Sequence, residues 1–562
     1  MLARRFYSGA SWFLLFLAGA GKTLQLSLMP FDYIIVGAGS AGCVLANRLS
    51  EDPACNVLLL EAGGKGNSKI NIPGAYGILH KTDVDWAFET EPQQFVNNRR
   101  LFVPRGKVLG GCSSTNAMAY VRGNAEDYNE WASLGNAGWS YNEVLPYFKK
   151  SENHEHFGEP FHAKNGLLNI CFAKYPSPLS KIFLDACTES GIEYNEDYNG
   201  PLQNGASMLQ YTMKNCKRHS TAAAFLLPAR KRSNLTTRTN VLVKQIIIKK
   251  HKAAGVEFFT GETSTEKVYC NKEVILSAGA IQSPQLLMVS GIGDPETLTK
   301  ADIDYKVALP GVGQNLQDHI WTTAGNLSIV PTSNNVLKPL NMFKGLMQYL
   351  LFKKGPFTNS PIEANAFLQT DTTLSRPDFQ FHFAPIYTGN DYTTDIYNIK
   401  TIPVTNGFGI LAILLRPESR GYVSIRSNKA FDAPVIQPQF LQAPNDRNTL
   451  LKGLRKAMEV LDAKAFKPYS PDGICHPSRN ATDDMLMEHI CKSLETLYHP
   501  VGTCKMGSDK MAVVNSRLQV RGIQSLRVID GSIMPTIISG NTNAACIMIG
   551  EKGADLIKED NA

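Results

Sequence analysis

A histidine near the end of the chain is the side chain best suited to move a proton. His499 stands in the segment Leu497–Cys504, directly before Pro500 and close to Gly502. Proline and glycine favour irregular backbone, so we expect the imidazole to be presented from a loop. Imidazole titrates near neutral pH, which suits a general acid or base. A lone histidine can also be a structural hydrogen-bonding residue, and this segment alone leaves both interpretations open.

A second group of polar residues follows His499 and opens a helix. The run Leu526–Gly531 reads as a strand ending in a carboxylate and a glycine, and Ser539–Asn543 precedes an apolar helix over 544–557. Such a helix start gathers N–H donors and the positive end of the helix dipole, which suits negative charge on a bound group. Ordinary N-capping by Asn541 or Thr542 is compatible with that role.

The elements that must position these residues begin with a nucleotide-binding pattern. Phe31–Val36 is typical of a buried strand, and 43–49 reads as a helix. Three glycines between them have G-x-G-x-x-G spacing: Gly37, Gly39 and Gly42. A second strand ends in Glu61, roughly twenty residues further on, where an adenosine ribose would present its hydroxyl groups. The pattern predicts a dinucleotide site.

A loop and a later strand extend this unit. Pro104–Met118 is rich in glycine, hydroxyl and amide groups, so it either lies against a planar ligand or forms a surface loop. Lys272–Leu276 reads as a strand that rejoins the first sheet, followed by a helix with Ser283 as its expected N-cap and Gly291 as its stop. The nucleotide domain is therefore expected to be discontinuous in sequence.

The middle of the chain predicts a second domain. Phe379, Phe381 and Phe383 alternate with polar residues, and Gly421–Arg426 is also strand-like. This favours an antiparallel sheet. The expected fold is thus α/β plus antiparallel β: a Rossmann-like, doubly wound domain and an antiparallel-sheet substrate domain.

Composition limits the function classes. The 562 residues include 43% hydrophobic and 19% charged side chains, which is typical of a globular protein of two to four domains. The net charge of +7 is mild and spread out, so nucleic acid is not an expected partner. Eleven cysteines without a C-x-x-C pair predict free thiols. No group of residues has the spacing of a metal site, so we expect no metal.

Residues 1–28 form a separate leader with several interpretations. The segment contains Arg4, Arg5 and a short apolar run from Trp12 to Leu17, but no acidic residue. A mitochondrial presequence is the preferred interpretation, a secretory signal is less favoured, and translation from Met29 would leave a cytoplasmic protein.

The motifs together resemble the glucose–methanol–choline (GMC) flavoprotein oxidoreductases from Phe31 to Lys558. The similarity rests on the glycine loop with Glu61 and on four further segments: 105–123, 279–293, 310–319 and 499–543. It implies FAD, with Glu61 at the adenosine ribose, Val243 near the adenine, Asp530 near the ribityl and pyrophosphate, and 110–118 along the isoalloxazine. The residues expected to bind FAD are Gly37, Gly39, Ser40, Ala41, Gly42, Glu61, Arg105, Val108, Gly110, Gly111, Ser113, Asn116, Ala117, Met118, Val243, Asp530, Gly531, Asn541 and Thr542.

The resemblance also implies a reaction. His499 is expected to be the base in alcohol oxidation, and Asn541 to hydrogen-bond the developing alkoxide. Family members with covalent FAD can carry histidine where this chain has Thr115, so we expect non-covalent FAD. Glu363 matches a position where choline dehydrogenases offer a carboxylate to a quaternary ammonium, which favours oxidation of choline to betaine aldehyde.

Several alternatives stay open. The substrate could be another alcohol or a sugar, the acceptor oxygen, a quinone or an electron carrier, and the enzyme a flavin-containing lyase without redox chemistry. Peripheral association with a membrane is also open. The expected organisation is a leader over 1–28, an FAD-binding region over 31–318 with a substrate-domain insertion at about 150–230, a substrate domain over 319–490 and a catalytic segment over 491–560.

Overall fold

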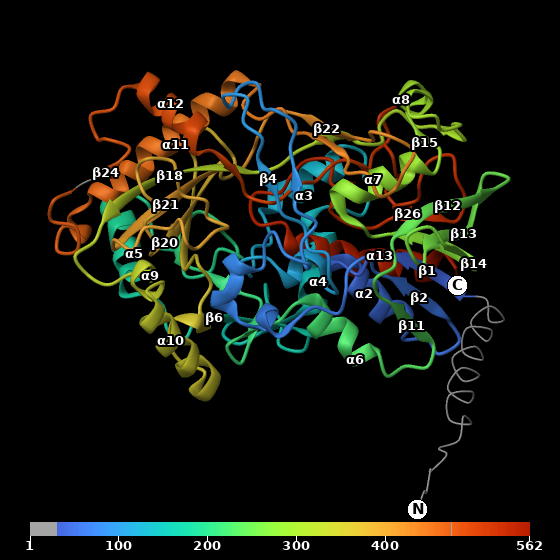
Figure 1. Ribbon diagram of the computed structural model, residues 1–562, viewed down its shortest axis with the longest axis horizontal. Coiled ribbons are helices and arrows are strands. Elements are labelled where there is room, and N and C mark those ends of the chain that lie inside the picture. Colours follow the sequence, from blue (N-terminus) through green and yellow to red (C-terminus); the bar gives the residue numbers. More distant parts are fainter. Residues whose placement is uncertain (1–30, 474, 562) are drawn as a thin grey trace, which may run out of the picture.

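The computed structural model describes residues 31–473 and 475–561, so the predicted leader lies outside the described residues. Two large sheets, each with its own layer of helices, make up most of the molecule (Figure 1). The chain passes between them several times, and its last helix, α13 (Asn543–Asp560), lies in the domain where the described chain begins.

The first sheet is built from distant parts of the chain. Its strand order is β11-β2-β1-β14-β13-β12, with β26 pairing with β14. β11, β2, β1, β14 and β26 run parallel, whereas β12 to β14 form an antiparallel meander. The bounds are β1 Phe31–Val36, β2 Val57–Leu60, β11 Leu235–Arg238, β12 Val243–Lys249, β13 Lys252–Phe259, β14 Thr265–Leu276 and β26 Leu526–Val528.

Two helices cover this sheet near its ligand-binding end. α2 (Ser40–Leu49) follows β1 directly, and α13 packs against it. The two helices approach closely because Gly550 has no side chain: a Cβ there would lie 3.0 Å from the carbonyl oxygen of Ala41. The apolar residues of β1, β2, α2 and α13 belong to one buried core.

The second sheet is antiparallel. Its order is β24-β18-β21-β20-β19-β7, with β25 (Glu495–Thr496) pairing with β18. The other strands are β7 Gly205–Met208, β18 Ile320–Leu327, β19 Ala364–Leu368, β20 Phe379–Ala384, β21 Gly407–Leu414 and β24 Cys475–His476. β7 comes from the region between the nucleotide-domain strands β2 and β11, so this sheet is also assembled from separate segments.

Phenylalanine alternates with other residues along β20, so the two faces of the sheet carry different side chains. Phe379, Phe381 and Phe383 point into a core shared with α5 (Pro178–Glu189) and α11 (Pro444–Asp462). Gln380 and His382 point to the opposite face and are also fully buried, because the rest of the protein covers that face. The predicted combination of a doubly wound, discontinuous domain and an antiparallel-sheet domain is confirmed.

One local prediction was wrong. α7 (Gly279–Val289) begins before Ser283, which is inside the helix and donates to Asp530 Oδ2 at 2.6 Å. Pro284 is tolerated because the carbonyl of Ala280, which loses its helical N–H partner, accepts a hydrogen bond from Thr503 Oγ1 at 2.6 Å. The predicted stop at Gly291 is confirmed, with φ of 87° directly after the helix.

Candidate active site

The glycine loop after β1 forms one end of a cavity of about 540 Å³. Gly37 has φ of 101°, and a Cβ there would lie 2.5 Å from the carbonyl oxygen of Ser277. A Cβ on Gly42 would lie 1.9 Å from the carbonyl oxygen of Gly37. Both positions therefore require glycine. Ser40 and Ala41, in the first turn of α2, line the cavity.

Glu61 lines the same cavity at the end of β2. Its Oε2 accepts the backbone N–H of Ala38 and its Oε1 that of Gly63, both at 2.8 Å. A carboxylate has about four acceptor positions, so these two bonds leave capacity for ribose hydroxyl groups. Burial raises the pKa of Glu61 to about 7.

Asp530 holds the opposite side of the cavity. Its Oδ2 accepts from the backbone N–H of Gly279 at 2.8 Å and from Ser283, while Oδ1 accepts the N–H of Ser532 at 2.8 Å. These bonds fix the carboxylate at the ends of β26 and β14. The adjoining α13 is tied to α2 by Ser40 Oγ, which donates to Asn543 Oδ1 at 2.7 Å.

A second cavity, of about 410 Å³, meets the first. Five residues line both: Ser40, Arg105, Cys112, Thr542 and Cys546. The two cavities therefore form one elongated site. Glu61, whose carboxylate could bind a ribose, lies in the first cavity and His499 in the second, and the N-termini of α2 and α13 border the region between them. This donor set fits FAD, whose negative pyrophosphate and long dinucleotide shape need these features.

The predicted FAD residues divide between the cavities. Those on the first cavity are Gly37, Gly39, Ser40, Ala41, Glu61, Arg105, Gly111, Val243, Asp530, Gly531 and Thr542. Those on the second are Ser40, Arg105, Asn116, Ala117, Met118, Asn541 and Thr542. Gly42, Val108, Gly110 and Ser113 line neither and instead shape the walls, as when Gly110 donates its N–H to the carbonyl of Ala38 at 2.7 Å.

His499 lies on an anchored loop in the second cavity. Its backbone N–H donates to Asp318 Oδ1 at 2.7 Å, and Gln317 and Val501 exchange backbone hydrogen bonds of 3.1 and 2.9 Å. The preceding residue, Tyr498, has φ of 68°, which is rare for an aromatic residue and is held by Arg105 donating to its carbonyl at 2.9 Å. The loop therefore fixes the direction of the imidazole.

Hydrogen bonds assign the tautomer of His499. His319 Nε2 lies 2.9 Å from the carbonyl of Leu415, which can only accept, so this nitrogen carries the proton. Burial lowers the pKa of His319 to about 3, which leaves its Nδ1 as an acceptor. His499 Nδ1, 3.0 Å away, must then be the donor, and its Nε2 is unprotonated.

The electrostatic environment keeps His499 neutral. Its pKa lies well below the ordinary range, first because of burial and then because of His319, His382 and Arg105. A neutral imidazole with an unprotonated Nε2 can accept a proton. Asp318, which holds the loop, has its pKa raised to about 7 by burial.

Two polar side chains next to His499 have unused hydrogen-bonding atoms. Asn541 Nδ2 lies 3.3 Å from His499 Nε2, and its Oδ1 is buried without a partner. His382 lines the cavity from β20 with both ring nitrogens unpaired. Unsatisfied buried groups are costly, so these atoms indicate a place for a polar ligand group.

Sequence reasoning missed His319 and His382 as site residues. The available signals were a histidine alternating with three phenylalanines in β20 and the Gln317-Asp318-His319 motif. Only the pairing of β18 with β25 and the position of β20 bring them to His499.

The role of Glu363 in substrate binding stays a prediction, although its carboxylate already has several hydrogen-bond partners. Glu363 is not among the described residues that line the second cavity. Its Oε2 accepts hydrogen bonds from the backbone N–H of Ser177 at 2.6 Å and from Ser180 Oγ at 2.7 Å. Oε1 accepts from Asn359 at 3.1 Å. Burial raises the pKa of this carboxyl. The first turn of α5 therefore uses the carboxylate as a cap.

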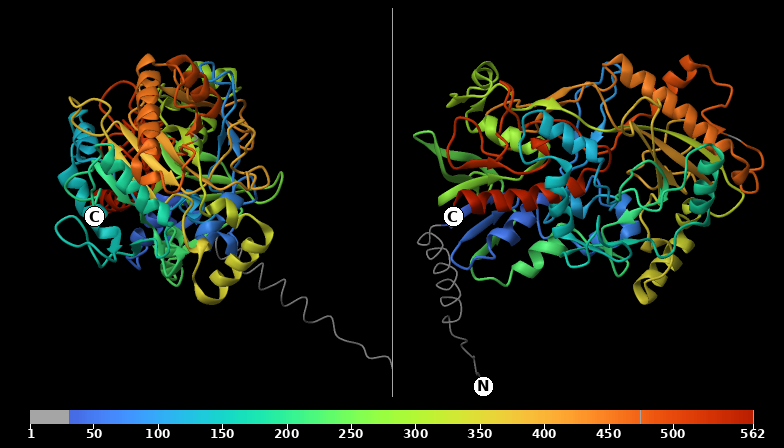
Figure 2. Two further views of the ribbon diagram at one scale, coloured as in Figure 1. Left: turned by 90° about the vertical axis from the view of Figure 1, so that its left-hand side faces the viewer. Right: turned by 180° about the vertical axis from the view of Figure 1, so that it is seen from behind.

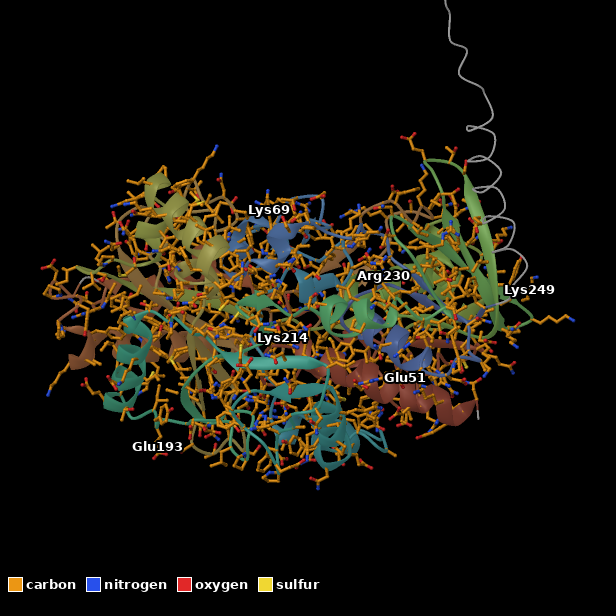
Figure 3. The ribbon with its side chains drawn as sticks, turned by 90° about the horizontal axis from the view of Figure 1, so that it is seen from below. Glu51, Lys69, Glu193, Lys214, Arg230 and Lys249 are labelled. Carbon is orange, nitrogen blue, oxygen red and sulfur yellow. The ribbon has the colours of Figure 1, made fainter. Side chains whose placement is uncertain are left out.

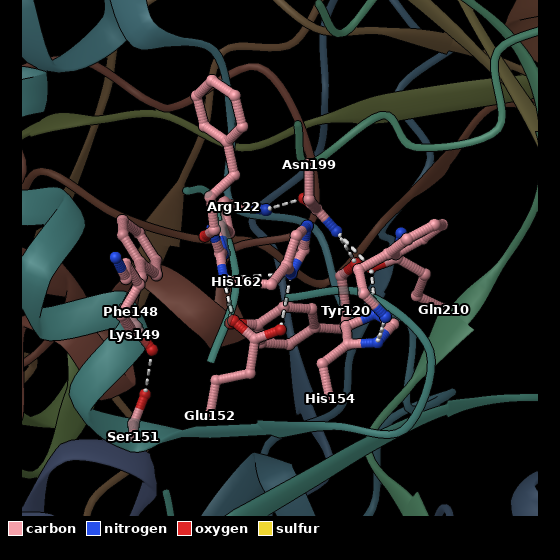
Figure 4. Close-up of polar contacts among 12 residues, drawn as sticks. Tyr120, Arg122, Phe148, Lys149, Ser151, Glu152, His154, His162, Asn199 and Gln210 are labelled. Carbon is pink, nitrogen blue, oxygen red and sulfur yellow. Dashed lines mark hydrogen bonds and ion pairs between the residues drawn. The ribbon is translucent and has the colours of Figure 1, made fainter. Parts of the chain in front are cut away.

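The absence of a metal stays a prediction, although three potential ligands lie within 4.8 Å of one another: Glu152, His154 and His162 (Figure 4). Glu152 already pairs with the buried guanidinium of Arg122 and with His162 Nδ1 at 2.7 Å. His154 Nδ1 accepts two backbone N–H groups at 3.1 Å. These partners give the cluster a structural role in joining β5 (Glu152–His154) to the loop that carries Arg122.

Comparisons with known proteins agree with this site. The GMC oxidoreductase N-terminal and C-terminal family models match residues 31–321 and 417–550. The chain is 39% identical over 536 residues to "Alcohol dehydrogenase [acceptor]" of Pseudomonas putida, covering 94% of this chain and 95% of that one. It is 38% identical over 540 residues to mitochondrial choline dehydrogenase of Mus musculus, covering 94% and 89%.

Solved structures also show the fold. Pyridoxine 4-oxidase from Mesorbium loti matches with a TM-score of 0.84 and 29% identity, covering 93% of this chain and 98% of that one. A solved structure of formate oxidase matches with a TM-score of 0.86 and 25% identity, covering 94% of this chain and 98% of that one. The chain therefore belongs to the GMC oxidoreductase family and is an FAD-dependent oxidoreductase that acts on alcohols.

Proposed function

We propose that the enzyme oxidises uncharged primary alcohols with an apolar chain. The observation that carries this proposal is the composition of the second cavity: none of the described residues in its wall is Asp, Glu or Lys. Apolar side chains dominate away from His499, among them Ile362, Ile386, Ile396, Ile402, Leu411 and Leu497. An alkyl or aryl chain would be transferred from water to this wall favourably, whereas a charge would lose its hydration.

The reacting hydroxyl group belongs at the inner end of this cavity. His499 Nε2 accepts its proton, because the tautomer set by His319 leaves that nitrogen unprotonated. Asn541 Nδ2 lies 3.3 Å from that nitrogen and can donate to the alkoxide once Nε2 carries the proton, and a neutral His382 offers one further N–H. Donors aimed at the developing negative charge lower its energy.

When FAD is bound, its isoalloxazine supplies the hydride acceptor. The residues of the two cavities would hold it, with Glu61 at the ribose and the start of α13 near the flavin. Thr115, which lines the second cavity, offers no ring nitrogen for a covalent bond, so FAD is held non-covalently. Acid precipitation should release all flavin into the supernatant; flavin that stays with the polypeptide would contradict this.

Choline is the second candidate substrate. Aromatic rings in the cavity wall, including Tyr76, Trp321, Tyr397 and Tyr498, can contact a quaternary ammonium by cation–π interaction. The choline dehydrogenase relatives favour it, whereas the engagement of Glu363 by the start of α5 supports the uncharged alcohol.

The deciding experiment is anaerobic flavin reduction by a series of n-alkyl alcohols and by choline. Because each buried methylene contributes about 0.8 kcal/mol, the second-order rate of flavin bleaching should rise about fourfold per methylene until the cavity is full. Choline should bleach the flavin more slowly than an uncharged alcohol of the same length.

Each outcome separates the candidates. Faster reduction by choline than by every uncharged alcohol would support choline and reject the apolar substrate. Bleaching by sugars alone would reject both. A flavin band that none of these compounds bleaches would favour the lyase alternative. After reduction, admitting oxygen or adding a quinone analogue would identify the acceptor class.

A further inference from the structure

Helix α10 (Pro339–Phe352) presents an apolar face to solvent. Leu340, Phe343, Leu350, Leu351 and Phe352 are 64%, 61%, 52%, 64% and 67% exposed. Positions 340, 343, 347 and 351 follow the helical spacing of one face. Other exposed large hydrophobic residues of the described chain occur mostly singly, which is normal, whereas five within thirteen residues form a patch that indicates an interaction surface.

The opposite face of α10 holds the helix in place. Gly345 allows close packing, since a Cβ there would lie 3.2 Å from the ring of Phe357 in η5 (Pro356–Thr358). Tyr349 donates from its hydroxyl group to the carbonyls of Cys216 at 3.1 Å and Asn71 at 3.3 Å. The helix therefore cannot rotate its apolar residues inward without losing these contacts. It projects from the body of the molecule in both views of Figure 2.

Lysines border this apolar face. Four lysines lie at its ends and border, and no acidic residue occurs between the first and the last: Lys338, Lys344, Lys353 and Lys354. Lys69 and Lys214 are exposed near the carbonyls that anchor Tyr349, and both lie on the side seen in Figure 3, where Arg230, Glu51 and Glu193 are also labelled. Apolar residues bordered by lysines suit a surface of lipid headgroups with negative charge.

We propose that α10 docks on a bilayer surface that contains anionic lipids. Its apolar side chains enter the headgroup region, and its lysines contact phosphate and carboxylate groups. No described helix is long and apolar enough to cross a membrane, so this contact is interfacial. A symmetric pair of chains joined through α10 is less favourable, because a two-fold interface brings the same lysine-bordered patch of both copies together.

The docking face adjoins the active-site cavity. Val336, Leu337 and Met342 line that cavity from the start of the same region, and the cavity reaches exposed residues at Ile78 and Pro356. Pro356 belongs to η5, against which α10 packs. If the substrate is apolar, as proposed above, it can pass from the bilayer to this opening. Docking itself does not depend on the substrate.

Flotation of the full-length holoenzyme with vesicles tests the proposal. The vesicles contain phosphatidylcholine alone or phosphatidylcholine with phosphatidylserine. The test variant is F343E/L351E, and the matched control is L202E/Y305E, which adds the same charges at two exposed apolar positions elsewhere. Turnover with a soluble acceptor and thermal unfolding verify that both variants are folded.

We expect wild type and the control to float with the phosphatidylserine vesicles and to dissociate as salt is raised. F343E/L351E should bind at least about tenfold more weakly. Equal flotation of F343E/L351E and wild type would overturn the proposal, as would equal binding to both kinds of vesicle. Dissociation of a wild-type dimer by F343E/L351E, without vesicle binding by either protein, would overturn it in favour of self-association. None of these results depends on which alcohol is oxidised.

Discussion

His319 Nδ1 lies 3.0 Å from His499 Nδ1, while the other nitrogen of His319 donates to the carbonyl of Leu415 at 2.9 Å. The backbone carbonyl of Leu415, directly after β21, thereby determines, through two imidazole rings, which nitrogen of His499 faces the cavity without a proton. The pair connects the antiparallel sheet to the catalytic loop, and this dependence can be tested by substitution.

Replacement of His319 should slow proton transfer to His499 unless the new side chain can accept the hydrogen bond from His499 Nδ1. His319→Leu leaves the Nδ1–H of His499 without a partner, and we expect flavin reduction at saturating alcohol to slow by about tenfold to a hundredfold. His319→Asn offers an oxygen near the position of Nδ1 and should restore part of the rate and of the pH profile. Equal rates and profiles for the two variants in anaerobic stopped-flow would show that the acceptor is unimportant.

Removal of His499 should separate cofactor binding from turnover. His499→Ala is expected to keep its FAD, because the imidazole forms no bond to the residues around Glu61 and Asp530, and to lose about 10²–10⁴ in kcat. The matched control is His251→Ala at an exposed turn, which should retain full activity. Partial recovery on adding imidazole would support the role as base, whereas unchanged activity of His499→Ala would remove this residue from the mechanism.

The acid limb of kcat/KM should lie below the ordinary histidine pKa of about 6.5. Burial, His319, His382 and Arg105 lower the pKa of His499, so its neutral, proton-accepting form persists to lower pH, and activity is lost only as pH falls through the lowered pKa. The measurement is kcat/KM between mildly acidic and neutral pH, with flavin content checked at each point. An acid limb above 6.5 would contradict the assigned environment.

Glu363 should contribute to stability and not to substrate binding. Glu363→Gln loses one acceptor for the first turn of α5, and we expect the free energy of unfolding to fall by about 1–2 kcal/mol with KM unchanged for both cationic and neutral alcohols. Glu193→Gln at an exposed position is the control. A KM increase confined to choline would restore Glu363 to the substrate site.

Gly42→Ala should prevent FAD binding. The new methyl group would meet the carbonyl oxygen of Gly37 at 1.9 Å, which forces α2 away from the loop that faces the cavity. In Gly261→Ala the Cβ meets open space, so that variant should keep a normal ratio of flavin to protein. Normal flavin content in Gly42→Ala would show that the helix can shift without cost.

The parts of this site that the sequence predicts are those with local causes. The glycine loop, Glu61 and the stop at Gly291 follow from backbone demands within a few residues, so their positions could be predicted. His319 and His382 become functional through strand pairing across long separations, which no local pattern contains. Glu363 also depends on a distant contact: its carboxylate, a group that could bind a ligand, accepts a hydrogen bond at the start of α5 from Ser177, 186 positions earlier in the chain.

The order of the strands also has a consequence for biosynthesis. β1 pairs with β14, β14 pairs with β26, and α13 packs on α2, so the first unit of the nucleotide domain is completed only when β26 and α13 have left the ribosome, long after α2. Asn541 and His499 belong to that same late segment. The nascent chain therefore holds an incomplete cofactor cradle with exposed apolar surface until α13 has been synthesised, and we expect it to need chaperone protection during that time. We therefore expect stable flavin incorporation only after α13 has been synthesised.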